Sequence, residues 1–397
     1  MKILFYRYNS IYEPDCIEAF KSYGIEVEEE TTEMTKKDMT PGEVVGLVAD
    51  RILKAVDGGD PYLFVFSINF YPAVSDICEK LHTIYACWSV DCPVTELFAK
   101  QITNRFNRVF LFDRTQYERI SRYNPECTFY LPLGTNVDRL DKTIATITAA
   151  DRMKFSADIS FVGSLYSEKN PMKKLKLSEH TAGYIDGLIN AQLKVYGCNF
   201  IEESLTKEVV EELKGGSISK EDDFTVESLD YYVAAHSFIG MEIAERERIA
   251  TLNMLAKDFN VDLYTASDTS PLIGVNNRGR ANSLLEMPKI FNLSKINLNI
   301  TMRPIQTGLS LRLFDVMGSG GFLMTNYQAE IPDLYEPGVD LETYGSMEEL
   351  HDKCAYYLEH EDERLEIAAN GYRKTKELHT VRNRVRTMIE CMLQQST

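Results

Sequence analysis

Short segments that are apolar along almost their whole length alternate with amphipathic helical stretches in the first half of this 397-residue chain. Such strands are buried on both faces, which is typical of a parallel sheet covered by helices on each side. Helices are expected around 15–23 and 74–81. The pattern predicts an N-terminal doubly wound domain over residues 1–155. Its expected strands are MKILFYRY (1–8), YLFVFSI (62–68), TIYACWSV (83–90), RVFLFD (108–113) and CTFYLPL (127–133).

A second series of apolar segments predicts another parallel sheet, in a C-terminal domain over residues 156–380. Its four expected strands are DISFVGS (158–164), VDLYTAS (261–267), KINLNIT (295–301) and GGFLMTN (320–326). A polar, helix-rich stretch of about 167–259 separates the first two strands and is much longer than an ordinary crossover, so we expect a helical insertion. The predicted fold class is α/β, with two doubly wound domains facing a cleft.

The tail of the chain carries helix signals. Ser346, followed three residues later by Glu349, is a capping-box pattern that predicts the start of a helix. A further helical series over 362–392 is expected to break near Gly371.

The formal net charge is −17, from 60 acidic and 43 basic residues, and it repels nucleic acid and anionic lipid surfaces. No segment approaches the roughly 20 apolar residues of a membrane span. The opening MKILFYRYNS also lacks the features of a signal peptide. We therefore expect a cytoplasmic protein without stable membrane insertion and without a nucleic-acid partner, while the oligomeric state stays open.

Eight cysteines are scattered without a CxxC pair, and six histidines do not cluster. We interpret the cysteines as reduced and mostly buried thiols, because a disulfide framework or a zinc ribbon needs tighter spacing. No protein-built metal site and no resident cofactor are expected.

The segment 299–322 carries the strongest signal for a ligand site, because ligands of open parallel sheets bind beyond the carboxyl ends of the strands. A polar loop containing Arg303 and Thr307 follows an expected strand, and Gly308 is expected to open a helix. One face of that helix is a core-facing stripe, formed by Leu309, Leu313, Val316 and Met317.

Arg312 and Asp315 fall on another face of the same helix. The N–H groups of Gly308, Leu309 and Ser310, together with Arg312, suit a diphosphate, since the helix dipole favours anions at this end. A carboxylate at Asp315 can accept two hydrogen bonds from ribose hydroxyls. The alternative is a solvated face that carries only an Arg312–Asp315 ion pair.

A second strand-to-helix loop contains Gly163, Ser164 and Lys169. A turn of small residues with a lysine nearby suits a phosphate group. An ordinary turn explains the same residues equally well.

Several segments together resemble a known family. SKINLNI from Ser294, GLSLRLFDVMGSGGFLMTNY from Gly308, YLEH from Tyr357, NGY from Asn370 and HTVRNRV from His379 resemble the bacterial glycosyltransferases related to the spore-maturation protein CgeB. FSINFYPAVSDIC, CWSVDCP and YLPLGTN are similar to the domain that often precedes that module. The resemblance implies the GT-B architecture with two Rossmann-like domains, a nucleotide-sugar donor held mainly by the second domain, and no essential metal ion. It also implies that the last helix, 381–397, crosses back onto the N-terminal domain.

The wider group of retaining GT-B enzymes has two glutamates eight positions apart, of which the second binds ribose. Asp315 matches the second position, whereas Thr307 stands at the first, so the contact to the donor sugar and the stereochemistry stay open. The resemblance places a uracil-reading loop near Gly279, Arg280, Ala281 and Asn282, although the Arg280 side chain is also interpreted as a solvated loop residue.

A transferase must stabilise the charge that develops on the leaving diphosphate. Helix N–H groups with Arg312, Lys169 and Arg303 can supply this without a metal. If configuration inverts, the acceptor hydroxyl also needs a base, and Asp91, directly after an apolar strand, is the candidate. The alternative for Asp91 is a turn residue that caps a helix beginning near Val94.

The function expected from these patterns is transfer of a sugar from a nucleotide-sugar, with uridine implied by the resemblance, to a protein or glycan acceptor. A nucleotide-sugar epimerase would share the fold, but the long insertion favours an acceptor. A non-catalytic nucleotide-sugar-binding partner of another transferase is a further alternative, because Thr307 breaks the motif.

Overall fold

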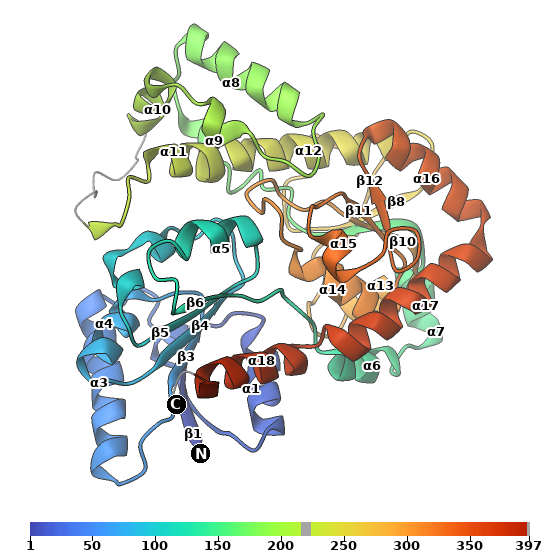
Figure 1. The fold of residues 1–397 in the computed structure, drawn as a ribbon. Coiled ribbons are helices and arrows are strands. Elements are labelled where there is room, and N and C mark those ends of the chain that lie inside the picture. Colours follow the sequence, from blue (N-terminus) through green and yellow to red (C-terminus); the bar gives the residue numbers. More distant parts are fainter. Residues whose placement is uncertain (216–223, 395–397) are drawn as a thin grey trace. The chain divides into compact units, whose positions relative to one another are not determined.

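The computed structural model describes residues 1–215 and 224–394 of the chain (Figure 1). They divide into two compact units. Residues 216–223 of the expected insertion and 395–397 of the expected last helix lie outside the described residues. Within the described part, the first unit contains residues 1–133, 224–229 and 381–394, and the second contains 134–215 and 230–380.

The first unit is built on a six-stranded sheet in the order β2-β1-β3-β4-β5-β6, with every pair of neighbours parallel. The strands are β1 (Lys2–Tyr6), β2 (Glu26–Glu30), β3 (Val65–Ile68), β4 (Tyr85–Ser89), β5 (Asn107–Leu111) and β6 (Thr128–Tyr130). The helical segments are α1 (Glu13–Ser22), α2 (Thr32–Thr35), α3 (Pro41–Asp57), α4 (Pro72–Lys80), η1 (Thr95–Phe98), η2 (Lys100–Thr103), α5 (Arg114–Ile120) and α18 (Val381–Gln394). The chain turns from β1 to β2 on one side and to β3 on the other, so the switch point of this sheet lies between β1 and β3.

The five strands expected in this unit are confirmed, but the edge strand β2 was not expected. Its sequence EVEEE is acidic rather than apolar. Arg51 of α3 pairs with two of its carboxylates, at 2.9 Å from Glu30 and 3.0 Å from Glu28, and thereby offsets the repulsion between them.

The second unit holds another six-stranded parallel sheet, in the order β12-β11-β10-β7-β8-β9. The strands are β7 (Ala157–Val162), β8 (Val261–Tyr264), β9 (Asn276–Asn277), β10 (Ser294–Asn299), β11 (Leu323–Asn326) and β12 (Glu342–Tyr344). The four expected strands are confirmed, whereas β9 and β12 are too short to give an apolar pattern. The two sheets confirm the predicted α/β class.

Further helices surround the second sheet. They are α6 (Val137–Ile144), α7 (Ala149–Phe155), α13 (Met287–Leu293), α14 (Leu311–Gly318), α15 (Ile331–Leu334), α16 (Met347–Glu359) and α17 (Glu361–Leu378). Because α6 and α7 pack against α13, the units divide at residues 133 and 134, earlier than the expected boundary at 155. Helix α18 belongs to the first unit, where it packs against α1.

The expected break near Gly371 is wrong, since α17 runs through this residue to Leu378. The missing side chain serves close packing instead. A Cβ at Gly371 would lie only 2.2 Å from the carbonyl oxygen of Asp340. At the start of α16, Ser346 accepts a hydrogen bond from the N–H of Glu349, as the capping pattern predicts.

The insertion after β7 is helical, as expected. It contains η3 (Pro171–Lys174), α8 (Glu179–Gln192), α9 (Ile201–Ser204), α10 (Lys207–Lys214), α11 (Asp230–Tyr232), a π-helical segment (Val233–Ile239) and α12 (Gly240–Leu255). Helix α12 takes part in two apolar clusters. Ile243 near its start packs in the core of the insertion, while Leu252 and Leu255 near its end pack under the sheet.

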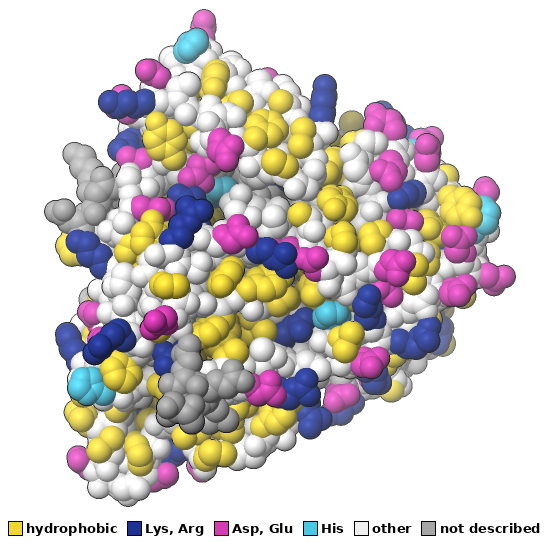
Figure 2. Space-filling view, viewed as in Figure 1, with side chains coloured by type: hydrophobic (Ala, Val, Ile, Leu, Met, Phe, Trp, Pro, Cys, Tyr) yellow, Lys and Arg dark blue, Asp and Glu magenta, His cyan; other side chains and the backbone are white. Residues whose placement is uncertain are grey.

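The surface shows no pronounced segregation of charge on the face seen in Figure 2, where acidic and basic side chains are interspersed. Within residues 1–215 and 224–394, no helix combines the length and the apolar character that crossing a bilayer requires. The cysteines are free thiols, and most of them are buried.

Candidate functional site

The switch point of the second sheet lies between β7 and β10, where the chain leaves neighbouring strands in opposite directions. Ligands of doubly wound sheets bind outside the carboxyl ends of the strands at such a point. Two loops leave the sheet here, 163–170 after β7 and 300–310 after β10. Most of the residues singled out in the sequence lie on these loops or on α14.

Helix α14 begins at Leu311 and has Ser310 at its N-cap position, so the expected start at Gly308 is wrong by three residues. The loop stays non-helical there because the side-chain amide of Gln328 donates to the carbonyl oxygens of Ile305, at 3.1 Å, and Gly308, at 3.2 Å. The expected core stripe is confirmed, since its four residues are all buried: Leu309, Leu313, Val316 and Met317.

The N-terminus of α14 presents the features that an anion needs. The first N–H groups of an α-helix have no partner within the helix, and the helix dipole is positive at this end. The Ser310 hydroxyl makes no capping hydrogen bond to the helix backbone. The N–H groups at the helix mouth are thus those of Leu311 and Arg312, which follow Ser310 directly.

Arg312 and Asp315 form an ion pair, with 3.2 Å between Nη1 and Oδ2. The guanidinium also lies against the Sδ atom of Met287, at 3.2 Å, and over the ring of Phe291. The other Asp315 oxygen accepts a hydrogen bond of 2.8 Å from the Thr135 hydroxyl. The pair is not a fully solvated one, because only 23% of the Arg312 side chain and 16% of the Asp315 side chain are exposed.

Burial lowers the pKa of Arg312, and the charge of Arg248 lowers it further against the opposing effect of Asp315. Arg248 of α12 is 8% exposed and was not singled out in the sequence. Its guanidinium donates to the carbonyl oxygen of Ser164 after β7 and, at 2.7 Å, to that of Ile300 after β10. It therefore bridges the two strands of the switch point.

The ring of Tyr166 stacks on Arg248, with 4.5 Å between its centroid and the guanidinium carbon. Nothing in the sequence distinguishes Arg248 from Arg246, which is partly exposed and pairs with Glu242 and Asp186. Only the path of α12 across the sheet brings one of these two arginines to the switch point.

The loop after β7 is held by its own side chains. Ser164 accepts a 2.8 Å hydrogen bond from the N–H of Tyr166 and donates one of 2.7 Å to Glu168. Tyr166 has a φ of +66°, a left-handed conformation that is uncommon for a residue with a side chain. Lys169 is exposed, with its amine 5.9 Å from the Tyr166 ring. At Gly163, a Cβ would lie 3.6 Å from Nη1 of Arg248.

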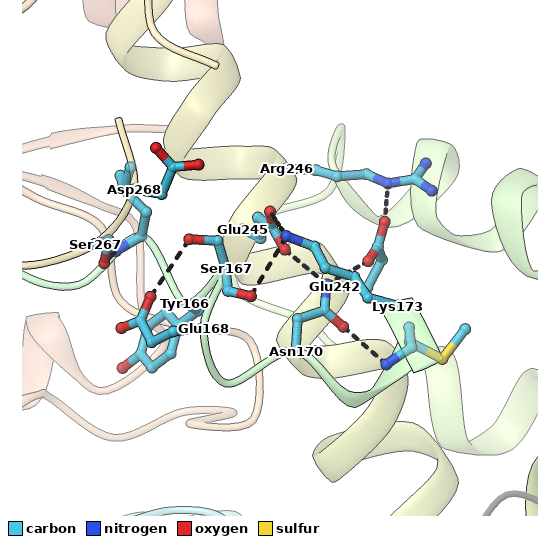
Figure 3. A network of polar contacts seen from close by, with 12 residues as sticks. Tyr166, Ser167, Glu168, Asn170, Lys173, Glu242, Glu245, Arg246, Ser267 and Asp268 are labelled. Atoms are coloured by element: carbon cyan, nitrogen blue, oxygen red, sulfur yellow. Dashed lines mark hydrogen bonds and ion pairs between the residues drawn. The ribbon is translucent and has the colours of Figure 1, made fainter. Parts of the chain in front are cut away.

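Figure 3 shows how this loop continues into the insertion. Asn170 donates from its amide to Glu242 and, at 2.7 Å, to Glu245 of α12. Lys173 pairs with Glu245 as well. A cavity of about 510 Å³ opens beside this network. Aliphatic and charged side chains of η3, α8 and α12 line this cavity, and none of the predicted site residues does.

The remaining residues predicted for the donor site lie in different surroundings. Arg280 is exposed in the loop after β9, next to Gly279, whose φ is +76°. The carbonyl of Thr307 accepts a hydrogen bond of 3.2 Å from the N–H of Glu330. Arg303 is 4% exposed and its guanidinium binds Glu247, so this side chain is turned into the protein interior.

Asp91 lies in the first unit, directly beyond β4. It accepts a hydrogen bond of 2.7 Å from the amide of Asn69, which follows β3 and has a φ of +58°. The same amide reaches the Tyr8 hydroxyl, at 3.0 Å, across the switch point of the first sheet. Burial and the charge of Asp91 raise the pKa of Tyr8 to about 12. Asp91 does not occupy the capping position of η1, which belongs to Val94.

No group of three or more histidine, cysteine, aspartate or glutamate side chains in the described part of the chain has an arrangement suited to a metal ion.

Residues 246–390 match a protein family described as glycosyl transferase-like. The matched region contains Arg248, the loop 300–310 and α14. An uncharacterized protein of Aquifex aeolicus (strain VF5) is 25% identical over 108 residues, a match that covers 26% of this chain and 27% of that protein. The match thus spans about a quarter of the length of that relative.

Solved structures resemble the whole chain. A glycosyltransferase from Rickettsia africae has a TM-score of 0.52 at 10% identity, with 99% of this chain and 98% of the other covered. Anabaena HepE in complex with UDP-glucose has a TM-score of 0.52 at 13% identity, covering 99% and 100%. A UDP-forming trehalose-phosphate synthase from Burkholderia xenovorans has a TM-score of 0.53 at 11% identity, covering 100% and 99%. The chain has the GT-B fold, and residues 246–390 are similar to the glycosyl transferase-like family.

Proposed function

We propose that this protein transfers a sugar from a UDP-sugar to a hydroxyl group of a protein or glycan acceptor. The observation that carries the proposal is the position of two arginines at one switch point. Arg248 bonds the backbone carbonyls of Ser164 after β7 and Ile300 after β10, and Arg312 lies in the first turn of α14, the helix that follows β10. Only one carboxylate, Asp315, is bonded to either of them among the described residues. An anion bound at this point relieves the repulsion between the two arginines.

The diphosphate is proposed to lie at the mouth of α14. There it accepts hydrogen bonds from the N–H groups that follow Ser310 and from Arg312, which now bonds Asp315 at 3.2 Å. Lys169 is exposed on the other loop and can swing its amine to the same anion. Asp315 is proposed to bind the ribose hydroxyls, and the backbone around Arg280 to read the base.

The similar structures support uridine as the nucleoside, because one is solved with UDP-glucose and another is described as UDP-forming. The segment from Gly308, which resembles the glycosyltransferases related to CgeB, supports placing this protein near that family among the GT-B glycosyltransferases. Arg303 is left out of the proposed donor contacts, since its guanidinium is bonded to Glu247.

Departure of the diphosphate leaves negative charge on its oxygens, and fixed donors at that position stabilise the transition state. For an inverting reaction we propose Asp91 as the base. Its carboxylate is exposed and held by the Asn69 amide, so one oxygen is oriented while the group can still accept a proton from a hydroxyl.

The test is to incubate the protein with UDP-, GDP- and TDP-sugars and to measure the released nucleotide, with and without glycan acceptors. We expect release with a UDP-sugar, and the same rate in the presence of EDTA, because basic groups take the place of a metal. Loss of release in EDTA and its recovery with manganese would show that a metal is required.

Thr307, in place of a glutamate, favours one competing function, a nucleotide-sugar-binding partner without its own turnover. Calorimetric titration with UDP separates the two. Binding of UDP without release from any donor would support the binding partner, and absence of both would contradict the proposed site.

A further inference from the structure

Glu247 and Arg303 form an ion pair that is almost completely removed from solvent. Their exposed fractions are 3% and 4%, and 2.8 Å separates Oε1 of Glu247 from Nη2 of Arg303. Such a pair contributes little net stability, because the desolvation of both charges offsets their attraction. A role of this pair is therefore to be found in the segments that it joins rather than in net stability.

The pair joins α12 to the loop that leads into α14. Glu247 directly precedes Arg248, which donates to the carbonyl of Ile300 in the same loop. Glu247 and Arg248, two successive residues of α12, thus bind the same loop at two positions, Arg303 and Ile300. The first residue of α12, Gly240, also meets this loop, since a Cβ there would lie 2.7 Å from the ring of Pro304.

The other contacts of Arg303 fix the loop from a second side. Nη1 of Arg303 donates to the carbonyl of Val195 at 2.8 Å, and the guanidinium carbon lies 4.3 Å from the centroid of the Tyr196 ring. The carbonyl oxygen of Arg303 accepts a 2.9 Å hydrogen bond from the amide of Asn199. Arg303 is therefore clamped between α12 and the segment that follows α8.

The surroundings of the pair are polar but incompletely bonded. Oε2 of Glu247, Nε of Arg303 and the hydroxyl of Tyr344 are buried and have no hydrogen-bond partner among the described residues. Burial raises the pKa of Glu247, and Arg303 works against this rise. Removing either member leaves the other as an uncompensated buried charge. Because a buried unpaired charge is strongly destabilising, we expect the loop 300–310 to move when the pair is broken.

We propose that the Glu247–Arg303 pair is a positioning device for the nucleotide site, which sets the loop 300–310 against α12 and so fixes Arg312 relative to Arg248. Both are positioning residues, and Arg303 does not contact the donor. The inference rests on the proposed function, because it assumes that the two arginines bind the diphosphate.

The experiment measures the UDP dissociation constant by calorimetry for Glu247→Gln, Arg303→Met and the double variant. A displaced loop is expected to weaken UDP binding by about ten- to a hundredfold in each single variant. The double variant is expected to be no weaker than the worse single one, because both changes remove the same constraint.

A direct contact between Arg303 and phosphate gives a different pattern and would overturn the inference. In that case Arg303→Met weakens binding, while Glu247→Gln leaves it unchanged or tightens it by freeing the guanidinium. The matched control is Glu342→Gln, which removes another buried carboxylate, paired with Lys353 at 3.0 Å, and is expected to leave UDP affinity within about twofold.

Melting temperatures measured without ligand identify variants that fail to fold. For that case Asn199→Ala removes the hydrogen bond to the Arg303 carbonyl, together with the one that Asn199 accepts from the N–H of Ile201. This variant is expected to weaken UDP binding by about two- to tenfold. Unchanged affinity in Asn199→Ala and Glu247→Gln would overturn the positioning role while leaving the proposed function intact. Failure of the unaltered protein to bind UDP would overturn both.

Discussion

Arg248 of α12 and Arg312 of α14 both lie at the switch point of the second sheet. Burial lowers the pKa of Arg312, and the charge of Arg248 acts in the same direction. Arg248 is fixed by two backbone carbonyls, whereas Arg312 is bonded to one carboxylate and one thioether. Arg312 is therefore the more adaptable of the two, and a bound anion is expected to draw it away from Asp315.

The first prediction concerns Arg312 and Asp315. If Arg312 binds the diphosphate and Asp315 the ribose, Arg312→Ala and Asp315→Ala should each weaken UDP binding by roughly 1.5–3 kcal/mol, the range for hydrogen bonds to charged groups. Calorimetric titration of the folded variants measures this. A simple ion pair would instead change stability by less than about 1 kcal/mol and leave the affinity as it was.

The second prediction compares two arginines of one helix. In the unaltered protein, UDP is expected to raise the melting temperature by mass action. Arg248→Met removes the bridge between the loops after β7 and β10, so UDP should no longer raise the melting temperature of this variant. Arg246→Met is the control, because Arg246 pairs with Glu242 and Asp186 instead. Equal ligand-induced shifts in both variants would argue against a role for Arg248.

The third prediction tests Asp91 as a base. Asp91→Asn keeps the size of the side chain but cannot accept a proton, and loss of a general base typically slows a reaction by about 10²–10⁴-fold. Turnover at saturating donor should fall by that factor while UDP affinity stays constant. Asn69→Ala, which removes the hydrogen bond that orients Asp91, should give a smaller decrease. An unaltered rate in Asp91→Asn would remove this residue from the mechanism.

The fourth prediction concerns packing around α17. Gly371→Ala forces a methyl group toward the Asp340 carbonyl and should destabilise the second unit by about 1–3 kcal/mol or more. Gly183 is an exposed glycine in α8 with open space around its Cβ position. Gly183→Ala should therefore stabilise by about 0.5–1 kcal/mol. Thermal denaturation of the two variants measures the contrast, and similar midpoints would contradict the packing argument.

Much of the fold could be predicted because buried parallel strands are apolar along most of their length, as β4 and β7 are. The strand β2 escaped prediction because its character is acidic, and it depends on Arg51, which is 21 residues away from Glu30. Pattern alone also placed a helix break at Gly371, where the actual requirement is the approach of another backbone. The strand β2 and the unbroken helix at Gly371 both depend on contacts between residues that are far apart in the sequence.

The candidate site was predictable to a smaller extent. Arg312 and Asp315 could be predicted as site residues because their spacing places them on one face of a helix that follows a glycine-containing loop. Arg248 and Glu247 lie some fifty residues before that loop, in a charged stretch of α12 whose members look alike in the sequence. Which of them are buried depends on how the helix crosses the sheet. Arg303 was predicted to bind phosphate because the sequence does not reveal its ion pair with Glu247, which lies far away along the chain.

Helix α12 has a consequence for how the insertion can vary. Its first turns complete the core of the insertion through Ile243, and its last turns complete the core under the sheet through Leu252 and Leu255. If the insertion is exchanged for a different one, the new segment must therefore place α12 with the same rotation about its axis and the same position along its axis. The insertion is thus tethered through α12 to the core of the second unit, and a transplanted insertion that shifts α12 by one residue would turn Arg248 away from the sheet.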